Sequence, residues 1–195
     1  MATTEYTTLA VVKGSLSKTT TDRDDLITQA IKSASRMIDD RAGRRFWIDD
    51  AVSARRLSLA EAHLDETGEL HIGVPDIATA TGLIVETGGP TTWTTVTSGT
   101  YYTDPDTAPG DGRPITDLYG AAGWLPSAGR IRVTAKWGWP SVPESIVQAT
   151  VLLASRIYRR KDSPQGVLGN AEWGAIRVSR MDPDVESLVA PFILI

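Results

Sequence analysis

The chain contains two histidines, His63 and His71, and acidic residues lie between them. Imidazole and carboxylate groups together are common ligands of transition-metal ions, and such a site can activate water for hydrolysis. The carboxylates concerned are Asp65, Glu66 and Glu69. This short segment is therefore the first place to look for chemistry.

The hairpin that would carry these side chains decides whether they can act together. A two-residue turn at Thr67-Gly68 would pair Leu64 with His71 and His63 with Ile72. Successive side chains of a strand point to opposite faces, so the two histidines would lie on opposite sides of the sheet. They could then not share an ion, whereas an irregular segment would leave a shared ion open. We expect two surface histidines and no metal ligands.

A second acidic segment, Asp104-Pro105-Asp106 with Gly110-Asp111, has some features of a calcium loop. Its spacing departs from the EF-hand pattern and no glutamate closes it, so turn-forming aspartates are the better interpretation. The sequence has no phosphate-binding glycine loop and no Gly-x-Ser-x-Gly motif, and no serine stands out as a triad partner for either histidine. We expect no catalytic residue and no cofactor.

Charge and composition exclude further classes of protein. The chain has 20 basic and 24 acidic residues, a net charge of -4, whereas a general nucleic-acid-binding domain is usually basic. It has no cysteine, which excludes disulfides and thiolate metal sites. No apolar run approaches the roughly 20 residues needed to cross a bilayer, and the N-terminus lacks the features of a signal peptide. We expect a soluble protein made in the cytoplasm, without membrane partners.

The two ends of the chain have helical patterns. Apolar residues recur at intervals of three and four from Leu26 to Ile38, which predicts a helix over 22–42 with Asp22 as its cap and Gly43 at its end. Pro143 is suited to the first position of a second long helix, over 143–160. Shorter helices are predicted after Thr7 or Thr8, either of which could be the cap, up to Gly14, and over 183–189, where Asp182 precedes a proline.

Between these ends the sequence changes to short runs rich in β-branched residues, separated by Gly, Pro, Thr and Asp. We therefore predict an α+β fold in which a small helical bundle core, residues 1–46 and 137–195 with a C-terminal tail, carries an inserted β-rich antiparallel subdomain, residues 47–136. A further short strand is predicted over 175–180. The predicted strands of the insertion are Ala54–Leu59, Glu69–Val74, Gly82–Thr87, Thr92–Thr97, Ile115–Tyr119 and Arg130–Trp137.

The helix over 143–160 is apolar most of the way round, which indicates burial on more than one side. One of those sides could be a neighbouring subunit, whereas basic residues at the end of a helix are often explained by its dipole alone. Arginine is enriched at protein interfaces and pairs well with carboxylates there. The candidate subunit-interface residues are Arg36, Arg41, Arg44, Val151, Arg156, Arg159 and Arg160.

An ordered set of short motifs resembles a known family. The motifs in the first half are Tyr6-Thr7-Thr8-Leu9, Asp24-Asp25-Leu26-Ile27, Ala34-Ser35-Arg36-Met37-Ile38-Asp39 and Gly43-Arg44-Arg45-Phe46. Those in the second half are Val74-Pro75-Asp76-Ile77, Gly112-Arg113-Pro114, Trp137-Gly138-Trp139-Pro140, Asp162-Ser163-Pro164 and Asp182-Pro183-Asp184-Val185. Together they cover about residues 5 to 192, and they resemble the head-to-tail adaptors, also called head completion or head–tail connector proteins, of long-tailed double-stranded DNA phages.

The resemblance implies a structural virion protein. Such adaptors form a ring, typically of twelve subunits, between the portal protein and a stopper or tail protein, and genomic DNA passes through the lumen without sequence-specific binding. The chain departs from the family in its wholly apolar end, where a more basic tail would be expected. Clustered apolar residues on a surface usually mark an interaction site, so we predict portal binding by Pro191, Phe192, Ile193, Leu194 and Ile195. The alternative is that this tail folds back onto its own helices.

Two functions from other classes remain as alternatives. A small metal-dependent hydrolase would use the acidic loops and should respond to divalent ions. A DNA-binding module should show an affinity that falls steeply with salt concentration. The adaptor interpretation requires binding alone, with no bond made or broken.

Overall fold

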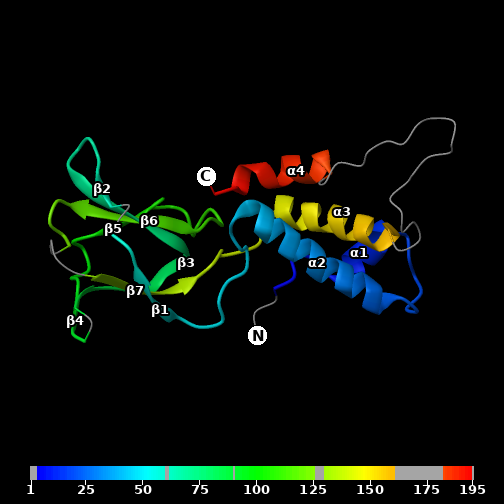
Figure 1. Ribbon diagram of the computed structural model, residues 1–195, viewed down its shortest axis with the longest axis horizontal. Coiled ribbons are helices and arrows are strands. Elements are labelled where there is room, and N and C mark those ends of the chain that lie inside the picture. Colours follow the sequence, from blue (N-terminus) through cyan, green and yellow to red (C-terminus); the bar gives the residue numbers. More distant parts are fainter. Residues whose placement is uncertain (1–3, 60–61, 90, 126–129, 161–181, 195) are drawn as a thin grey trace. The chain divides into compact units, whose positions relative to one another are not determined.

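The computed structural model describes residues 4–59, 62–89, 91–125, 130–160 and 182–194 and has an α+β fold, as the sequence predicts (Figure 1). Its elements fall into two units, each described by itself below. The sheet unit spans Trp47–Ser141, and the helical unit comprises the described residues between 4 and 46 and between 142 and 194. In this described part of the chain, every helix is too short or too polar to span a membrane. The strand predicted over 175–180 lies outside the described residues.

The helical unit contains four α-helices and a 3-10 turn, and α2 lies alongside α3 (Figure 1). Thr8 caps α1 by accepting a hydrogen bond from the Val11 N–H, and Asp182 caps α4 in the same way from Asp184. Gly43 closes α2 in the left-handed conformation, with φ at 67°. The elements are α1 (Leu9–Ser15), α2 (Asp24–Ala42), α3 (Glu144–Arg160), α4 (Pro183–Val189) and η1 (Ala190–Phe192).

Two predicted helix starts are wrong by one or two residues. The residue that precedes α2 is Arg23, because the Asp22 carboxylate accepts a hydrogen bond from the Thr20 hydroxyl and does not cap the helix. Pro143 stands just before α3, and its carbonyl accepts hydrogen bonds from the N–H groups of Ile146 and Val147. In both cases the helix ends where the sequence predicts.

The apolar surface of α3 is covered largely within its own chain. Helices α1, α2 and α4 all pack against it, which accounts for an apolar helix without a neighbouring subunit. Leu152 on α3 keeps 37% of its surface exposed. The buried residues of α3 are Ile146, Ala149, Thr150, Val151, Leu153, Ala154 and Tyr158.

The sheet unit is a seven-stranded antiparallel sheet in which β1, β7, β3, β6 and β5 follow in that order, and β2 and β4 pair with β3. The alternation of Ile131, Val133, Ala135 and Trp137 predicts β7 correctly, and all four side chains are buried. The strands are β1 (Ser53–Leu57), β2 (His63–Leu64), β3 (Glu69–Gly88), β4 (Trp93–Thr95), β5 (Tyr102–Asp104), β6 (Ile115–Ala121) and β7 (Arg130–Trp137).

Strand β3 is one element of 20 residues where the sequence predicts two shorter strands. Its first half pairs with β6 and its second half with β7, and the register shifts between Gly73 and Ile77, between Ile77 and Thr79 and between Thr79 and Ile84. These irregularities accommodate Pro75, which cannot donate a ladder hydrogen bond, and Gly82, whose φ is 78°. Both residues therefore mark bulges within the strand and do not end it.

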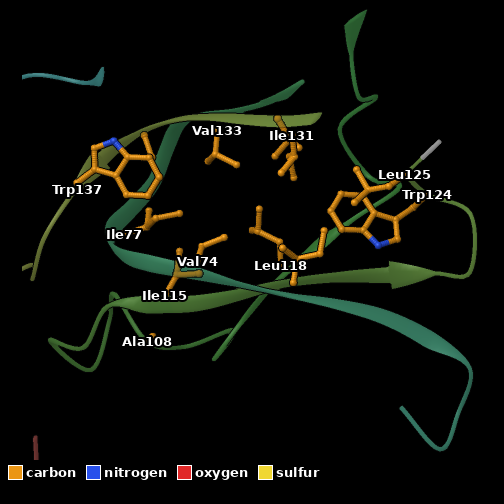
Figure 2. Close-up of a cluster of buried hydrophobic side chains, with 13 residues drawn as sticks. Val74, Ile77, Ala108, Ile115, Leu118, Trp124, Leu125, Ile131, Val133 and Trp137 are labelled. Carbon is orange, nitrogen blue, oxygen red and sulfur yellow. The ribbon is translucent and has the colours of Figure 1, made fainter. Parts of the chain in front are cut away.

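The sheet unit has a hydrophobic core of its own (Figure 2). Ile131, Val133 and Trp137 from β7 point toward Ile115 and Leu118 from β6, and all five are completely buried. The β-rich part thus has its own packed interior, and a helical bundle as the core of the whole chain is not confirmed. Long-range pairing along β3 creates this second core, and short sequence windows do not reveal such pairing.

The chain enters and leaves the sheet unit through two paired segments. Ile48 forms an isolated bridge with Gly138, and the Asp49 N–H donates to the Trp137 carbonyl at 2.8 Å. The Trp137 indole N–H donates to the Ser53 carbonyl at 2.8 Å. Residues 137–141 therefore belong to the sheet unit, which ends at Ser141.

Candidate functional site

Two of the predicted interface arginines hold α4 in the helical unit. Arg41 at the end of α2 makes a two-pronged ion pair with Glu186 on α4. Arg156 on α3 contacts Asp182, the residue that caps α4, with 3.1 Å between its Nη1 and a carboxylate oxygen. Val185 and Val189 on α4 are completely buried beside these pairs. These two arginines therefore have carboxylate partners inside their own chain.

The remaining candidates differ in their exposure. Val151 is only 6% exposed and packs within the helical unit, and Arg44 is half-buried. Arg159 and Arg160 are exposed in the last turn of α3, and neither makes an ion pair with another described residue. Arg36, Arg41 and Arg156 also keep part of their surface exposed, but each contacts a carboxylate of its own chain.

Arg36 belongs to a partly buried network that joins the N-terminal segment to α2. Its Nη2 donates to the Thr4 carbonyl at 2.6 Å and lies 3.1 Å from the Asp39 carboxylate. The Tyr6 hydroxyl donates to the other oxygen of Asp39 and accepts from the Phe46 N–H at 2.8 Å. The Tyr6 ring meets the Phe46 ring edge to face. No sequence pattern singled out Asp39 or Tyr6 as partners, because 33 residues separate them along the chain.

Burial in this network raises the pKa of Asp39 from 3.8 to about 6, although the Tyr6 hydroxyl and the Arg36 guanidinium oppose the shift. Burial, and the hydrogen bond to Asp39, also raise the pKa of Tyr6 well above its usual value. Since the folded state holds the Asp39 proton more tightly than the unfolded chain, protonation of Asp39 favours folding. This contribution is fully present below about pH 4 and is lost as the pH rises through about 6.

Changing Asp39 to asparagine should remove this part of the pH dependence. Relative to the variant, the wild-type protein should lose up to about 2 kcal/mol of unfolding free energy between pH 4 and pH 7. Urea unfolding of both proteins across that range measures the difference. The matched control is Asp40→Asn, because Asp40 is an exposed neighbour on the same helix. Parallel curves for wild type and Asp39→Asn would show that Asp39 does not titrate in this range.

The predicted portal-binding tail lies against the helical unit as far as it is described. The Phe192 ring meets the Phe46 ring edge to face, with centroids 5.7 Å apart, and the Leu194 N–H donates to the Ala42 carbonyl at 2.9 Å. Phe192 and Ile193 are half-buried, Leu194 is 54% exposed, and Ile195 lies outside the described residues. This is the arrangement of the fold-back alternative, and it still leaves Leu194 on the surface.

The histidine hairpin differs from its predicted register by one residue. Glu66, Thr67 and Gly68 form a three-residue loop, in which Gly68 has a φ of 84° and donates its N–H to the Asp65 carbonyl. His63 therefore pairs with His71 and Leu64 with Leu70. The predicted pairing of His63 with Ile72 is wrong, and the two histidines lie on the same face of the sheet. The argument that the two histidines cannot share a metal ion because they lie on opposite faces of the sheet therefore no longer holds.

Around this hairpin, aromatic rings form a ladder across neighbouring strands. His71 stacks between His63, at a centroid distance of 5.5 Å, and Tyr119, at 5.1 Å. Tyr102 on β5 continues the ladder beside Tyr119, on the face opposite the buried Ile72 and Leu118. The side chains of Asp65 and Glu69 converge with that of His71, and one potential ligand atom from each of the three lies within 4.8 Å of the others.

No protein-family model and no curated protein matches the sequence. The fold, however, is similar to solved structures. One match is a chain in the neck of an empty gene transfer agent particle, computed with C6 symmetry: the TM-score is 0.50, the sequence identity is 18%, and the match covers 96% of this chain and 89% of that chain. Another is a chain in the virion of the native gene transfer agent particle, with a TM-score of 0.50, 19% identity and the same coverage. This chain therefore shares, over nearly its whole length, the fold of chains from the neck and virion of gene transfer agent particles.

Proposed function

We propose that the protein is a head-to-tail adaptor, a structural subunit of a tailed phage or phage-like particle that joins the portal to a stopper or tail protein. The observation that carries the proposal is the fold match over 96% of the chain to a chain from a particle neck. The ordered motifs along the sequence resemble phage adaptors independently of that match. The two comparisons use different information, one the residues and the other the backbone, and they support the same position in a particle.

In this proposal the adaptor acts by forming a ring through which genomic DNA passes. A closed ring requires a heterologous interface, in which two different surfaces of one subunit meet head to tail. The matched neck was computed with C6 symmetry, and rings of six or twelve subunits are both compatible with a sixfold axis. We propose twelve, and a location in the virion connector after synthesis in the host cytoplasm.

Arg159 and Arg160 are the interface residues that we propose first. They are exposed at the negative end of the α3 dipole, whereas Arg41 and Arg156 are engaged with α4 and Arg36 with Asp39. The chain carries a net charge of -4, so carboxylates are abundant on a neighbouring copy. Arg36, Arg41, Arg44, Val151 and Arg156 would then support the interface indirectly, by maintaining the shape of the helical unit.

The double variant Arg159→Glu/Arg160→Glu should fold normally and fail to assemble. Both side chains are exposed, so the melting temperature should stay within a few degrees of wild type. Like charges facing the neighbour's carboxylates should reduce ring assembly on the portal at least about tenfold. The matched control, Lys18→Glu/Lys32→Glu, makes the same change of net charge at two other exposed positions. Equal loss of assembly in both variants would assign the effect to net charge and not to this surface.

Mixing the purified protein with its portal tests the function itself. Electron microscopy should show an added ring beneath the portal, and light scattering should give a mass increase of several adaptor subunits per portal ring. Binding of only one or two adaptors per portal would contradict the proposal. Salt-sensitive binding to duplex DNA without portal binding would instead favour the DNA-binding alternative.

A further inference from the structure

We propose that Asp65, Glu69 and His71 form a binding site for one divalent transition-metal ion, of the zinc or nickel type. The three side chains come from the loop and from strand β3 of the hairpin whose register differs from the sequence prediction. The inference concerns the sheet unit alone, and it stands whether or not the chain is an adaptor.

The distances suit such an ion. The His71 Nε2 atom and the free Asp65 carboxylate oxygen lie 3.4 Å apart. Two ligand atoms on a tetrahedral zinc ion, each about 2.1 Å from the metal, are separated by about 3.4 Å. One potential ligand atom from each of Asp65, Glu69 and His71 lies within 4.8 Å of the other two, so a modest rotation of the flexible Glu69 side chain completes three ligands. A metal ion can therefore bind without movement of the backbone.

Asp65 is held in place by its own loop. One oxygen of its carboxylate accepts hydrogen bonds from the Thr67 N–H and the Glu69 N–H, both at 2.9 Å, and from the Thr67 hydroxyl at 2.8 Å. The second oxygen is directed at His71. These hydrogen bonds fix the orientation of the carboxylate, so that its second oxygen is presented to a cation beside His71.

The ring ladder holds the second ligand. His71 is almost parallel to Tyr119, with 8° between the ring planes, and His63 covers its other side at 20°. A ring held between two others can rotate little, which keeps the edge that carries Nε2 toward Asp65. The same restraint is usual for metal-binding histidines, whose orientation is fixed by groups outside the ligand set. His63 lies directly opposite His71 and could supply a fourth ligand by rotation of its side chain.

The ligand types select the class of metal. Calcium and magnesium prefer sites made of oxygen ligands alone, whereas imidazole favours zinc, nickel, copper and cobalt. The side chains are partly shielded, with 21% of His71 and 31% of Asp65 exposed. A bound ion would join the loop to β3 and so hold the end of the hairpin against the sheet.

Isothermal titration of the tag-free, full-length protein with zinc chloride tests the proposal. We expect one saturable site per chain, a raised melting temperature in the presence of zinc, and no comparable response to magnesium or calcium. His71→Phe should weaken zinc binding at least about tenfold, because phenylalanine keeps the stack on Tyr119 but offers no nitrogen. Glu69→Gln should also weaken it. The matched control is Glu66→Gln, an exposed acid of the same loop that lies outside the cluster, and it should bind zinc as the wild type does.

Three results would overturn the proposal: no saturable zinc binding to the folded protein, equal weakening by Glu66→Gln and Glu69→Gln, or equal binding of calcium and zinc. The last two would indicate diffuse attraction to an acidic loop. Circular dichroism of each variant shows whether it is folded, and nuclear magnetic resonance of the imidazole nitrogens reports ligation directly. A zinc-induced shift of the His71 nitrogens in the wild type would therefore be expected even if a variant failed to fold.

Discussion

Replacing Gly138 with alanine should destabilise the sheet unit by about 2–5 kcal/mol, from overpacking and backbone strain together. A Cβ atom at this position would lie 2.0 Å from the Trp47 carbonyl oxygen and 3.0 Å from the Ile48 Cα. Both are backbone atoms of the segment that bridges Gly138, so neither can move aside without breaking the bridge. The φ of Gly138 is 110°, a region that residues with a side chain rarely adopt.

Gly99→Ala separates the two causes in this prediction. Gly99 has a φ of 93°, but a Cβ there would meet nothing within 4 Å. This control should cost about 1 kcal/mol, the expected penalty for the backbone conformation alone. Urea unfolding followed by tryptophan fluorescence measures both variants, since Trp137 and Trp139 flank Gly138 in the sequence. Equal losses at the two positions would show that the close approach of Trp47 has no energetic effect.

Removing the residues after Ala190 should lower the stability of the helical unit by about 2–4 kcal/mol, less than the full loss of a buried phenylalanine. The truncation deletes the Phe192 ring from its contact with Phe46 and the Leu194 N–H from the Ala42 carbonyl. Thermal unfolding of the truncated and full-length chains measures the change. An unchanged melting temperature would show that the tail contributes nothing to the fold.

The truncation alone cannot distinguish an effect of the tail on stability from an effect on portal binding. The variant Leu194→Asp can distinguish them. Leu194 is 54% exposed, so this variant should keep its melting temperature within a few degrees. We propose that the exposed side chain of Leu194 contacts the portal, and that multivalency around a ring strengthens each weak contact. Portal binding should then fall at least about tenfold in Leu194→Asp, with Lys32→Asp as an exposed control. Unchanged portal binding would restrict the tail to the fold-back role.

Local sequence patterns correctly predicted those elements whose start, end and type depend on residues close together in the sequence. The alternation from Ile131 to Trp137 gives β7 with both ends correct, and the periodicity before Gly43 gives α2 to within two residues. The sequence predicted Asp182 as a cap and left Thr7 or Thr8 as the other, because the hydrogen bonds that caps accept reach only two or three residues along the chain. Each of these features depends on residues close together in the sequence.

The features that the sequence did not predict depend on residues far apart in the sequence or on a difference of one residue in loop length. The continuity of β3 through Pro75 and Gly82 follows from its two partners, β6 and β7, which hold the halves together across bulges. The register of the histidine hairpin differs from the prediction because its loop has one additional residue, and the Asp65 carboxylate stabilises this loop. That single residue determines whether His63 and His71 share a face.

The candidate interface residues show the same difference between features that depend on nearby residues and features that depend on distant ones. An arginine at a helix end is visible in the sequence, but its partner is not: Glu186 lies 145 residues from Arg41, and Asp182 lies 26 residues from Arg156. Only the folded helical unit distinguishes arginines with a carboxylate of their own from Arg159 and Arg160. The sequence could therefore suggest candidate arginines but could not rank the members of the set.

The bridge between Ile48 and Gly138 holds the two ends of the sheet unit side by side, so the unit could be replaced as a whole. Its first and last segments are hydrogen-bonded to each other, so any replacement domain with adjacent ends could be spliced in without lengthening the connections. Strands could be gained or lost between Ile48 and Gly138 without any change in the sequence of the helical segments. Lineages that carry this fold could therefore exchange or enlarge the sheet unit while the helical segments before and after it in the sequence evolve separately.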